Sequence, residues 1–439
     1  MGFPGTSQDR RHFDAQVKEV INMPSPLFVG IDVGSEANVV CCLTRDEEKR
    51  PLSRFTITNN RPGIMEFKDR IAKLVQKHGF EQILFGLEHT GCYSTHAAIY
   101  IHRHLDFGVQ NKNVYVFNPS LIKEFKQSHY LDAPKNDRVD AWFIAAKLRV
   151  GHLPHPFSWN EPLMALQRLT RARFHLMQDL TRESNFLMTN LFLKFSDYTV
   201  TGPFHKNKLS ATSLAVMEEF ESAEALADMS LDKLIDFLVL HGKNRFDDPQ
   251  AVARTLQKAA RSSYRLPQSM ADSVNLAMAS SIRVIRTVQE QLKSLKKAIE
   301  DHLRTIPQTL DSVPGIGPIF ASGILAEVDI SQFKSHKELA KYAGLAWTQN
   351  QSGKFTANRT RLIRSGNRYL KYYLIEAANS VRVHDPVFAK YYAIKKAEPK
   401  EFADKRALAL TARKLVRLVF YLLKTDRLYK PEGVIRQNA

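Results

Sequence analysis

The chain has few of the features that mark secreted or membrane proteins. Only three of its 439 residues are cysteines, which is too few for a disulfide framework. Two of them, Cys41 and Cys42, are adjacent, and no histidine stands beside them at metal-ligand spacing. We therefore expect this pair to be small buried hydrophobic side chains, and the compartment to be reducing.

Long apolar runs are also missing. The best candidate, residues 408–423, is interrupted by Arg413, Lys414 and Arg417, so it predicts an amphipathic helix and not a membrane span. The first residues, MGFPGTSQDRRHF, lack the apolar centre of a secretion signal. The sequence therefore predicts a cytoplasmic protein without a membrane partner.

Glycine is scarce as well, since 19 glycines are roughly 4% of the chain against an average of about 7%. This scarcity bears on one possible function. The segment IDVGSEAN, which begins at Ile31, resembles the phosphate-binding turn of actin-like ATPases such as sugar and acetate kinases. Those enzymes need further glycine-rich nucleotide loops, and no second one is evident. A kinase is therefore an alternative that ATP turnover by the purified protein would revive.

Positive charge, by contrast, is abundant. The chain has 63 Lys and Arg residues against 45 Asp and Glu, which gives a formal net charge of +18 and a pI near 9.7. Neutralising phosphates releases condensed counterions, so such an excess favours a polyanionic partner. The composition predicts binding to nucleic acid.

Four acidic residues stand where a divalent-metal nuclease needs them. Asp32 lies in FVGIDVG and Glu88 in ILFGLEHTG, each at the end of a predicted strand, while Asp137 and Asp140 share one helical turn in KNDRVDA. Mg²⁺ prefers oxygen ligands and keeps water and substrate phosphate in its remaining positions. The four carboxylates therefore predict metal-assisted phosphodiester chemistry.

The region from residue 26 to about 151 has the pattern of an α/β domain. Three apolar runs at hairpin spacing precede alternating strands and helices, which is the order of a ribonuclease-H-like domain. The first and fourth strands should then lie side by side, with Asp32 and Glu88 at their carboxyl ends. The last helix should begin near Pro134 and place Asp137 and Asp140 on one face.

The next region, from about residue 159 to 307, is almost wholly helical. Apolar residues recur at three-and-four spacing in two segments, Met177, Leu180, Leu187 and Leu191 in the first, and Ile285, Val288, Leu292, Leu295 and Ile299 in the second. Such arms would pack as an antiparallel pair or join partner subunits, and an ordinary helical bundle is equally compatible with the pattern. Residues 196–269 between them resemble an inserted helical subdomain to which we assign no chemistry.

The C-terminal region begins with SVPGIGPIFASGIL, residues 312–325, which has the shape of a helix-hairpin-helix. Gly315 and Gly317 would let the backbone turn tightly, so that its NH groups can hold a phosphate oxygen. We expect this hairpin to contact a nucleic-acid backbone.

A polar, glycine-containing segment, WTQNQSGKF, follows and contains Ser352. Cationic residues stand after this serine, namely Lys354, Arg359, Arg361, Arg364 and Arg368. A serine rimmed by such groups can attack or hold a phosphate, because the cations stabilise charge on its oxygens. The alternative is a turn serine that bonds its own backbone. The second Ser-Gly pair, at Ser365, is expected to be a cap or turn before the next helix.

Taken together, these motifs resemble one protein family over most of the chain. IDVG, the glutamate of LEHTGCY and KNDRVDA match its N-terminal half, and VPGIG, YAGLAWTQNQSGK and RSGNRYLKYYLIEAA match its C-terminal half. The sequence resembles the DEDD transposases of bacterial insertion sequences, the IS-one-ten family of bridge-RNA-guided recombinases. Trp347 departs from this family, where many relatives have proline, and is a candidate to stack on a base.

The resemblance implies two chemistries that act together. Asp32, Glu88, Asp137 and Asp140 would be Mg²⁺ ligands in a RuvC-like domain, and Ser352 would be the nucleophile that forms a covalent phosphoserine link to the cleaved strand. Donor and target DNA would be selected by a guide (bridge) RNA, both held mainly through their backbones. The active species would be a homo-oligomer, at least a dimer and a tetramer on the paired DNAs.

The same resemblance suggests a division of the chain. We expect an N-terminal extension (residues 1–25), a RuvC-like nuclease domain (26–155), a helical coiled-coil arm (156–307) with its inserted subdomain (about 196–269), a C-terminal transposase domain (308–427) and a tail (428–439).

Two alternatives stay open beside the kinase. A RuvC-like structure-specific DNA endonuclease would use only the four carboxylates, with Ser352 a bystander. A catalytically silent nucleic-acid-binding protein would bind equally well after loss of the acidic residues. Substitution of Ser352 by alanine separates the first from a recombinase, and Asp32→Asn separates the second from an enzyme.

Overall fold

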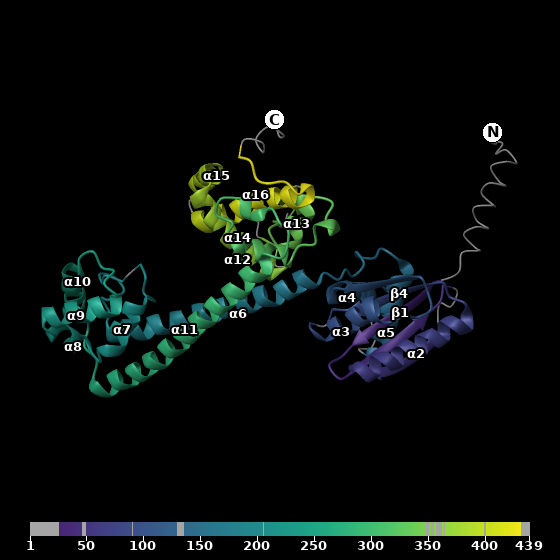
Figure 1. The fold of residues 1–439 in the computed structure, drawn as a ribbon, viewed down its shortest axis with the longest axis horizontal. Helices are drawn as coiled ribbons and strands as arrows, with labels where there is room; N and C mark the ends of the chain where they lie inside the picture. Colours follow the sequence, from purple (N-terminus) through teal and green to yellow (C-terminus); the bar gives the residue numbers. More distant parts are fainter. Residues whose placement is uncertain are drawn as a thin grey trace. The chain divides into compact units, whose positions relative to one another are not determined.

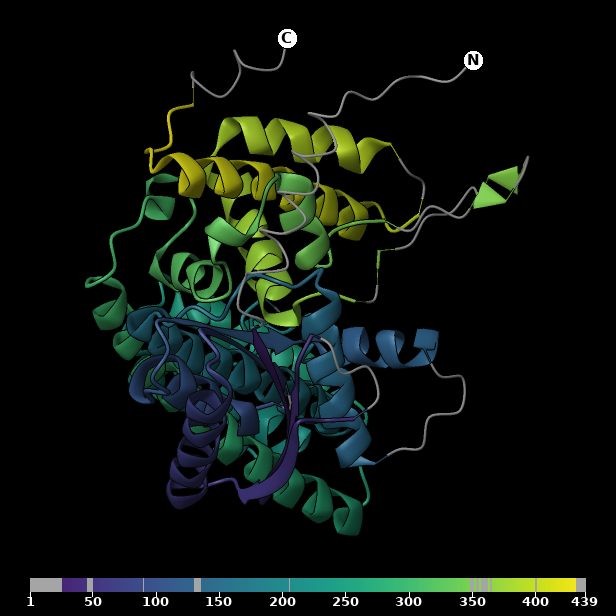
Figure 2. The same ribbon diagram turned by 90° about the vertical axis from the view of Figure 1, so that its right-hand side faces the viewer.

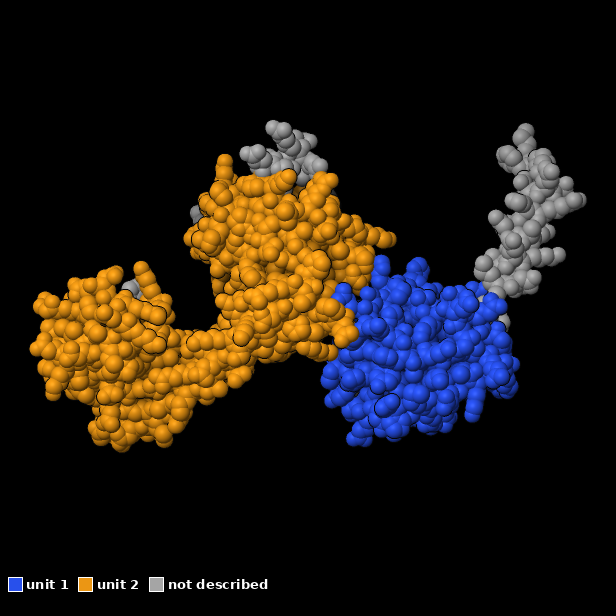
Figure 3. All heavy atoms as spheres, viewed as in Figure 1, with its two compact units in different colours: residues 1–160 blue, residues 161–439 orange. Residues whose placement is uncertain are grey.

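The computed structural model describes residues 26–45, 50–89, 91–129, 136–204, 206–347, 351–352, 355–356, 362–363, 365–398 and 401–431. The chain divides into two compact units, Met1–Asn160 and Glu161–Ala439 (Figure 3). Each unit has hydrophobic cores of its own.

The first unit is built on a five-stranded sheet with the order β3-β2-β1-β4-β5. The strands are β1 (Leu27–Val33), β2 (Ala37–Leu43), β3 (Ser53–Thr58), β4 (Gln82–Glu88) and β5 (Asn111–Phe117). β1, β2 and β3 form an antiparallel meander, whereas β1, β4 and β5 run parallel. This is the strand arrangement of a ribonuclease-H-like fold, and the predicted adjacency of the first and fourth strands is confirmed (Figure 1).

Helices cover both faces of this sheet. They are α2 (Arg61–His78), α3 (Tyr93–Ile99) with the π-helix Tyr100–His104, α4 (Pro119–His129) and α5 (Asp137–Val150). Alternate residues of β1 enter different cores: Val29 and Ile31 pack with α2 and α3, whereas Phe28 packs with α4 and α5. Strands buried on both faces explain the near-continuous apolar runs in the sequence. Cys41 and Cys42 are buried as expected, and Cys92 is exposed.

The second unit begins with a long helical arm. α6 (Glu161–Lys194) and α11 (Gln268–Leu303) lie side by side along their length (Figure 1). Leu166 near the start of α6 packs in one core with Leu303 near the end of α11, and Leu191 near the end of α6 packs in another with Val274 near the start of α11. The two helices are therefore an antiparallel pair within one chain, roughly 50 Å long at 1.5 Å per residue.

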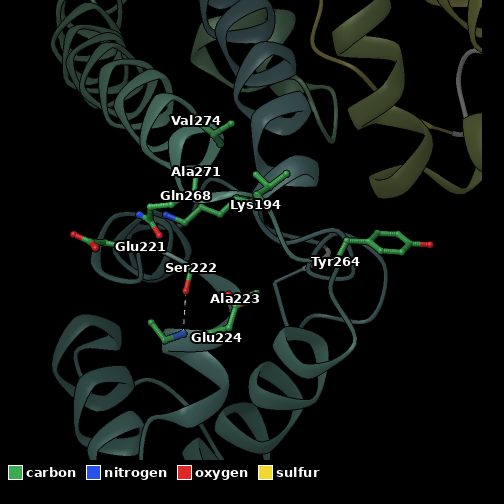
Figure 4. Close-up of a pocket in the computed structure, with 11 residues that line it drawn as sticks. Lys194, Glu221, Ser222, Ala223, Glu224, Tyr264, Gln268, Ala271 and Val274 are labelled. Carbon is green, nitrogen blue, oxygen red and sulfur yellow. Dashed lines mark hydrogen bonds between the residues drawn. The ribbon is translucent and has the colours of Figure 1, made fainter.

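Four short helices pack at one end of the arm, between α6 and α11. These are α7 (Ala211–Glu219), α8 (Ala223–Asp228), α9 (Leu231–Gly242) and α10 (Pro249–Arg261). A cavity of about 320 Å³ lies where they meet the arm, with Lys194 in its lining (Figure 4). Lys194 is only 6% exposed, and its Nζ donates a hydrogen bond to the Met217 carbonyl at 2.9 Å. Burial lowers the pKa of this lysine to about 8. Its role is structural, because the hydrogen bond to Met217 joins the end of α6 to α7.

The rest of the second unit is a helical domain around one large core, to which the start of α6 and the end of α11 contribute. Its helices are α12 (Pro318–Leu325), α13 (His336–Tyr342), α14 (Arg368–His384), α15 (Pro386–Ala397) and α16 (Ala403–Thr425). Two short strands, β6 (Gln351–Ser352) and β7 (Phe355–Thr356), pair antiparallel between α13 and α14 (Figure 2).

The interrupted apolar run near the C-terminus forms part of α16. Its apolar side chains, among them Leu415, Val419 and Leu422, are buried in the core, whereas Arg417 is exposed. The run is thus an amphipathic helix, as predicted. In the part of the chain that the structure describes, we find no helix with the length and apolar character needed to span a bilayer.

Candidate active site

Sheet register brings the first two acidic residues together. Ile31 of β1 pairs with Leu87 of β4 in parallel register, and Asp32 and Glu88 are the residues that follow them. Side chains alternate along a strand, so both carboxylates leave the sheet on the same face, at neighbouring carboxyl ends. Their placement agrees with the prediction from the sequence.

Two glycines let helix α5 lie directly on these strands. Gly30 and Gly86 are paired in register, two residues before Asp32 and Glu88. A Cβ on Gly30 would lie 2.3 Å from the Ala141 carbonyl oxygen, and a Cβ on Gly86 would lie 2.8 Å from an Ile144 methyl group. Any larger side chain would push α5 away, so this pair of glycines holds the helix against the strand ends.

Helix α5 brings the other two acidic residues. It begins at Asp137, and Asn136 is its N-cap, with an extended backbone and a side chain that accepts the Arg138 N–H at 2.9 Å. The predicted start near Pro134 is wrong, because the Asn136 cap stops the helix there; Pro134 itself lies outside the described residues. Asp137 and Asp140 therefore lie in the first turn, where the helix dipole favours negative charge.

The charges of these four side chains act on one another. Burial, followed by the negative charges of Asp140, Asp137 and Glu88 in that order of effect, raises the pKa of Asp32 to about 7. The pKa of Glu88 is also raised, first by burial and then by Asp140. The negative charges that raise the pKa of Asp32 and Glu88 in this way come from carboxylates close to them. Three separate elements thus converge on one acidic cluster.

A lysine that the sequence did not single out lies in the cluster. Lys126 of α4 places its Nζ 2.7 Å from Asp140 Oδ1, and the two side chains are only 16% and 22% exposed. Its charge lowers the pKa of both Asp32 and Glu88, against the larger effects that raise them. Among the described residues, four carboxylates and the half-buried Lys126 leave an excess of negative charge in the cluster.

The cluster suits a hard divalent cation in chemistry, because all four donors are carboxylates. Nucleases with a DEDD or RuvC-like site typically use divalent metal ions. Among the described residues, no three acidic, histidine or cysteine side chains are close enough to hold an ion as they stand. The donor set and its excess negative charge fit a cation, and the side chains would have to draw together around it.

Ser352, the candidate nucleophile, belongs to the second unit. It lies on β6 and pairs with Phe355 of β7, so the predicted loop contains a small antiparallel strand pair. The side chain of Ser352 lies outside the description, as do Lys354, Arg359, Arg361 and Arg364. Trp347, the candidate base-stacking residue, lies beneath the Arg413 guanidinium, which is 5.5 Å from the centre of its ring.

Arg368, the last of the predicted cations, is the first residue of α14 and is exposed. Its guanidinium donates to the Tyr369 hydroxyl at 2.9 Å and lies 5.8 Å from the centre of the Phe174 ring. Asn367 is the N-cap of α14, with a side chain that accepts the N–H groups of Tyr369 and Leu370, both at 3.0 Å. The predicted cap at SGN is therefore confirmed.

The glycines of the VPGIG hairpin have different surroundings. Gly315 has a positive φ of 95°, and a Cβ there would lie 2.8 Å from the Val381 Cα, so this glycine allows close packing against α14. Gly317 is exposed and is the N-cap of α12. The helix before the hairpin is a single 3₁₀ turn, Leu310–Ser312. Phosphate contact by this hairpin stays a prediction, with Gly317 the more accessible of the two.

Comparison with known proteins identifies the family. The DEDD transposase model of the IS110 group matches residues 29–195, and the model of the "Transposase IS116/IS110/IS902 family" matches residues 307–393. Together these matches span more than half of the chain. They include the four acidic residues and the segment that carries Ser352.

Curated relatives match over most of the chain. A 42 kDa protein of insertion element IS900 from Mycobacterium paratuberculosis is 25% identical over 93% of this chain and 98% of its own. A 44.8 kDa protein of IS116 from Streptomyces clavuligerus is 25% identical over 74% of this chain and 80% of its own.

Among solved structures, RuvC of Thermus thermophilus aligns over 30% of this chain and 99% of its own, with 14% identity and a TM-score of 0.23. The fold assignment therefore depends on the strand order and register described above, and not on this likeness. The two family matches support an enzyme that acts on DNA, and not the alternative functions of a kinase or a silent binding protein. The chain belongs to the IS110 family of insertion-sequence transposases, which recombine DNA.

Proposed function

We propose that this transposase cuts and rejoins DNA through a covalent phosphoserine intermediate at Ser352, aided by Mg²⁺ held by Asp32, Glu88, Asp137 and Asp140. One observation carries the metal part of the proposal. Burial, together with the charges of carboxylates from β4 and α5, raises the pKa of Asp32 on β1 to about 7. When bound, Mg²⁺ would stabilise the charge that develops on the phosphate oxygens.

The acidic cluster would bind and orient rather than attack. Asp32 and Glu88 are fixed at strand ends, and α5 is held against them by Gly30 and Gly86, so the backbone is already in place and only the side chains would have to draw together. Lys126 would hold Asp140 in place while no cation is bound. Such a site would activate a phosphodiester bond, and we assign the attack on it to Ser352.

Ser352 would supply the nucleophile. Its hydroxyl oxygen would form a bond to phosphorus as the bond from phosphorus to one strand's oxygen breaks; the serine proton passes to a base and the leaving oxygen takes up a proton. The hydroxyl of a new strand then attacks the phosphoserine and releases Ser352. One phosphoester replaces another at each step, so strands are rejoined without ATP.

The proposed partners follow from charge and from family likeness. The net charge of +18 supports backbone contacts to donor and target DNA and to a guide RNA that selects them. We propose a dimer, or a tetramer on paired DNAs, because the arm exposes large apolar side chains such as Phe186, Leu276 and Val284. The proposed modules are the RuvC-like domain 26–155, the arm 156–307 with its subdomain about 196–269, and the transposase domain 308–427.

Alanine substitution of Ser352 tests the proposal. We expect Ser352→Ala to lose all strand exchange. It should also lose the covalent protein–DNA adduct, which is measured on denaturing gels. Ser365→Ala is a matched control, because it removes the hydroxyl of a second Ser-Gly pair, which is exposed, and it should retain both. Strand exchange by Ser352→Ala would refute the nucleophile, and cleavage without exchange or adduct in the parent protein would favour a RuvC-like endonuclease.

A further inference from the structure

A buried carboxylate outside the acidic cluster joins three parts of the second unit. Glu327, just after α12, is only 5% exposed. Arg171 of α6 donates to both of its oxygens, with Nε to Oε1 at 2.7 Å and Nη2 to Oε2 at 2.8 Å. Gln167, one helical turn earlier on α6, donates to the neighbouring Ala326 carbonyl at 2.9 Å. The arm is thereby attached to the end of α12.

The same carboxylate also holds the start of α14. Asn367 Nδ2 donates to Glu327 Oε2 at 2.7 Å, while its Oδ1 caps α14. Asn367 is further bonded to the end of α13, where its backbone N–H donates to the Tyr342 carbonyl at 2.7 Å and its Nδ2 lies 3.1 Å from the Tyr342 hydroxyl. Glu327 therefore fixes the point at which α13 and α14 meet.

That point is the base of the segment that carries Ser352. The segment leaves α13 after Tyr342 and returns at Asn367, and its two ends cross closely: a Cβ on Gly366, whose φ is 124°, would lie 2.6 Å from the Gly344 nitrogen. Further along, the Ile363 N–H donates to the Ala346 carbonyl at 2.9 Å. Both ends of the segment are therefore held by one hydrogen-bonded cluster.

We propose that Arg171 and Glu327 are positioning residues, a buried ion pair through which arm helix α6 sets the base of the Ser352 segment. A buried ion pair rarely adds stability compared with apolar side chains of similar size, because both charges lose their hydration. A bidentate pair instead fixes the relative orientation of the two elements that carry it, since the planar guanidinium meets the carboxylate in one geometry. Its catalytic consequence rests on the proposed role of Ser352.

The arm contains a matched pair for comparison. Arg286 of α11 also contacts both oxygens of a glutamate, Glu218 of α7, at 3.0 and 2.5 Å. These side chains are 45% and 30% exposed, and they join the arm to the short helices at its end. Loss of this pair removes another bidentate Arg–Glu contact, made through Nη1 and Nη2 of the arginine, without touching the Ser352 segment.

The test separates stability from position. Arg171→Met alone leaves Glu327 as an unpaired buried charge, so it should lower the melting temperature strongly. The double variant Arg171→Met/Glu327→Gln removes both charges and keeps an amide oxygen for Asn367, so its melting temperature should recover. We still expect amide hydrogen exchange across residues 343–366 to be about tenfold faster and strand exchange about tenfold slower, with Arg286→Met/Glu218→Gln unchanged in both.

Two outcomes would overturn the proposal. The first is a double variant that regains parental hydrogen exchange and parental recombination together with its melting temperature, because the pair would then be structural only. If the double variant does not fold, Arg171→Lys, which keeps the charge and loses the bidentate contact, replaces it; unchanged exchange across residues 343–366 is the second refuting result. Hydrogen exchange is read without DNA, so it stands even if Ser352→Ala shows that the nucleophile is wrong.

Discussion

The two candidate sites of this transposase are built in opposite ways. The acidic cluster uses regular elements: carboxylates at the ends of two paired strands and in the first turn of a helix that lies on them. Ser352, in contrast, lies on a two-residue strand in a segment anchored at its base by Glu327 and Asn367. A sheet fixes charges that repel one another, whereas the segment that carries Ser352 is held at its base.

The largest expected effect tests the acidic side of this comparison. Asp32→Asn should lower Mg²⁺-dependent DNA cleavage by more than about a hundredfold, since even the hydrogen-bonding partners of metal ligands contribute 10–100-fold. The fold should persist, because asparagine has nearly the same shape and removes a buried charge. Cleavage assays and circular dichroism would measure the two properties.

Glu81→Gln is the matched control for this variant. Glu81 is exposed and directly precedes β4, the strand that Glu88 ends. The control therefore removes a carboxylate from the end of β4 that lies away from the acidic cluster. If Asp32→Asn cleaved DNA as fast as Glu81→Gln, the acidic site would have no catalytic role through Asp32. Only the serine segment would then be left with one.

A smaller effect should appear at Lys126. Lys126→Gln leaves the half-buried Asp140 without its cation, so we expect the metal-free protein to lose about 1–3 kcal/mol of unfolding free energy. Addition of Mg²⁺ should restore more stability to this variant than to the parent protein. Thermal unfolding with and without Mg²⁺ would measure both quantities.

Lys123→Gln removes an exposed lysine one turn earlier on α4 and should change neither quantity. Equal Mg²⁺ stabilisation of the Lys126 and Lys123 variants would mean that Lys126 is not the charge that a cation replaces.

A further effect concerns pH. The pKa of Asp32 rises from 3.8 to about 7 on folding, so the folded protein binds a proton that the unfolded chain has released. Stability from this group is therefore present at low pH and is lost as pH rises from about 4 to 7. Melting of the metal-free protein should show this loss, and Mg²⁺ should stabilise more strongly at pH 8 than at pH 5.5.

Asp32→Asn has no proton to lose at this position, so its melting temperature should depend less on pH over the same interval. A parent protein whose stability in the absence of metal is as flat as that of the variant would contradict the burial of Asp32 among like charges.

Much of the acidic site was predictable because it follows from local pattern and strand order. Apolar runs that each end in an acidic residue place Asp32 and Glu88, since register between β1 and β4 leaves one arrangement that buries both faces. The start of α5 was misplaced because proline is a good first-turn residue, whereas the Asn136 side chain is the cap that the chain uses.

Lys126 and Glu327 were missed for a different reason. In sequence, Lys126 belongs to a helix with other charges on its surface, and Glu327 stands in an ordinary AEVDI segment. Their partners lie 14 and 156 residues away, at Asp140 and Arg171. No periodicity or motif signals an ion pair over such a separation, because the pairing exists only once the helices have packed.

The sequence alone determined the family, the alternation of strands and helices, the acidic quartet and the excess of positive charge, because these are properties of composition and short-range order. Only the tertiary structure decided which lysine forms an ion pair in the acidic cluster. It also decided that the two long helices pair within one chain, and that a buried glutamate joins the arm to the segment of Ser352. Those are contacts between residues far apart along the chain, and packing of complete elements is what selects them.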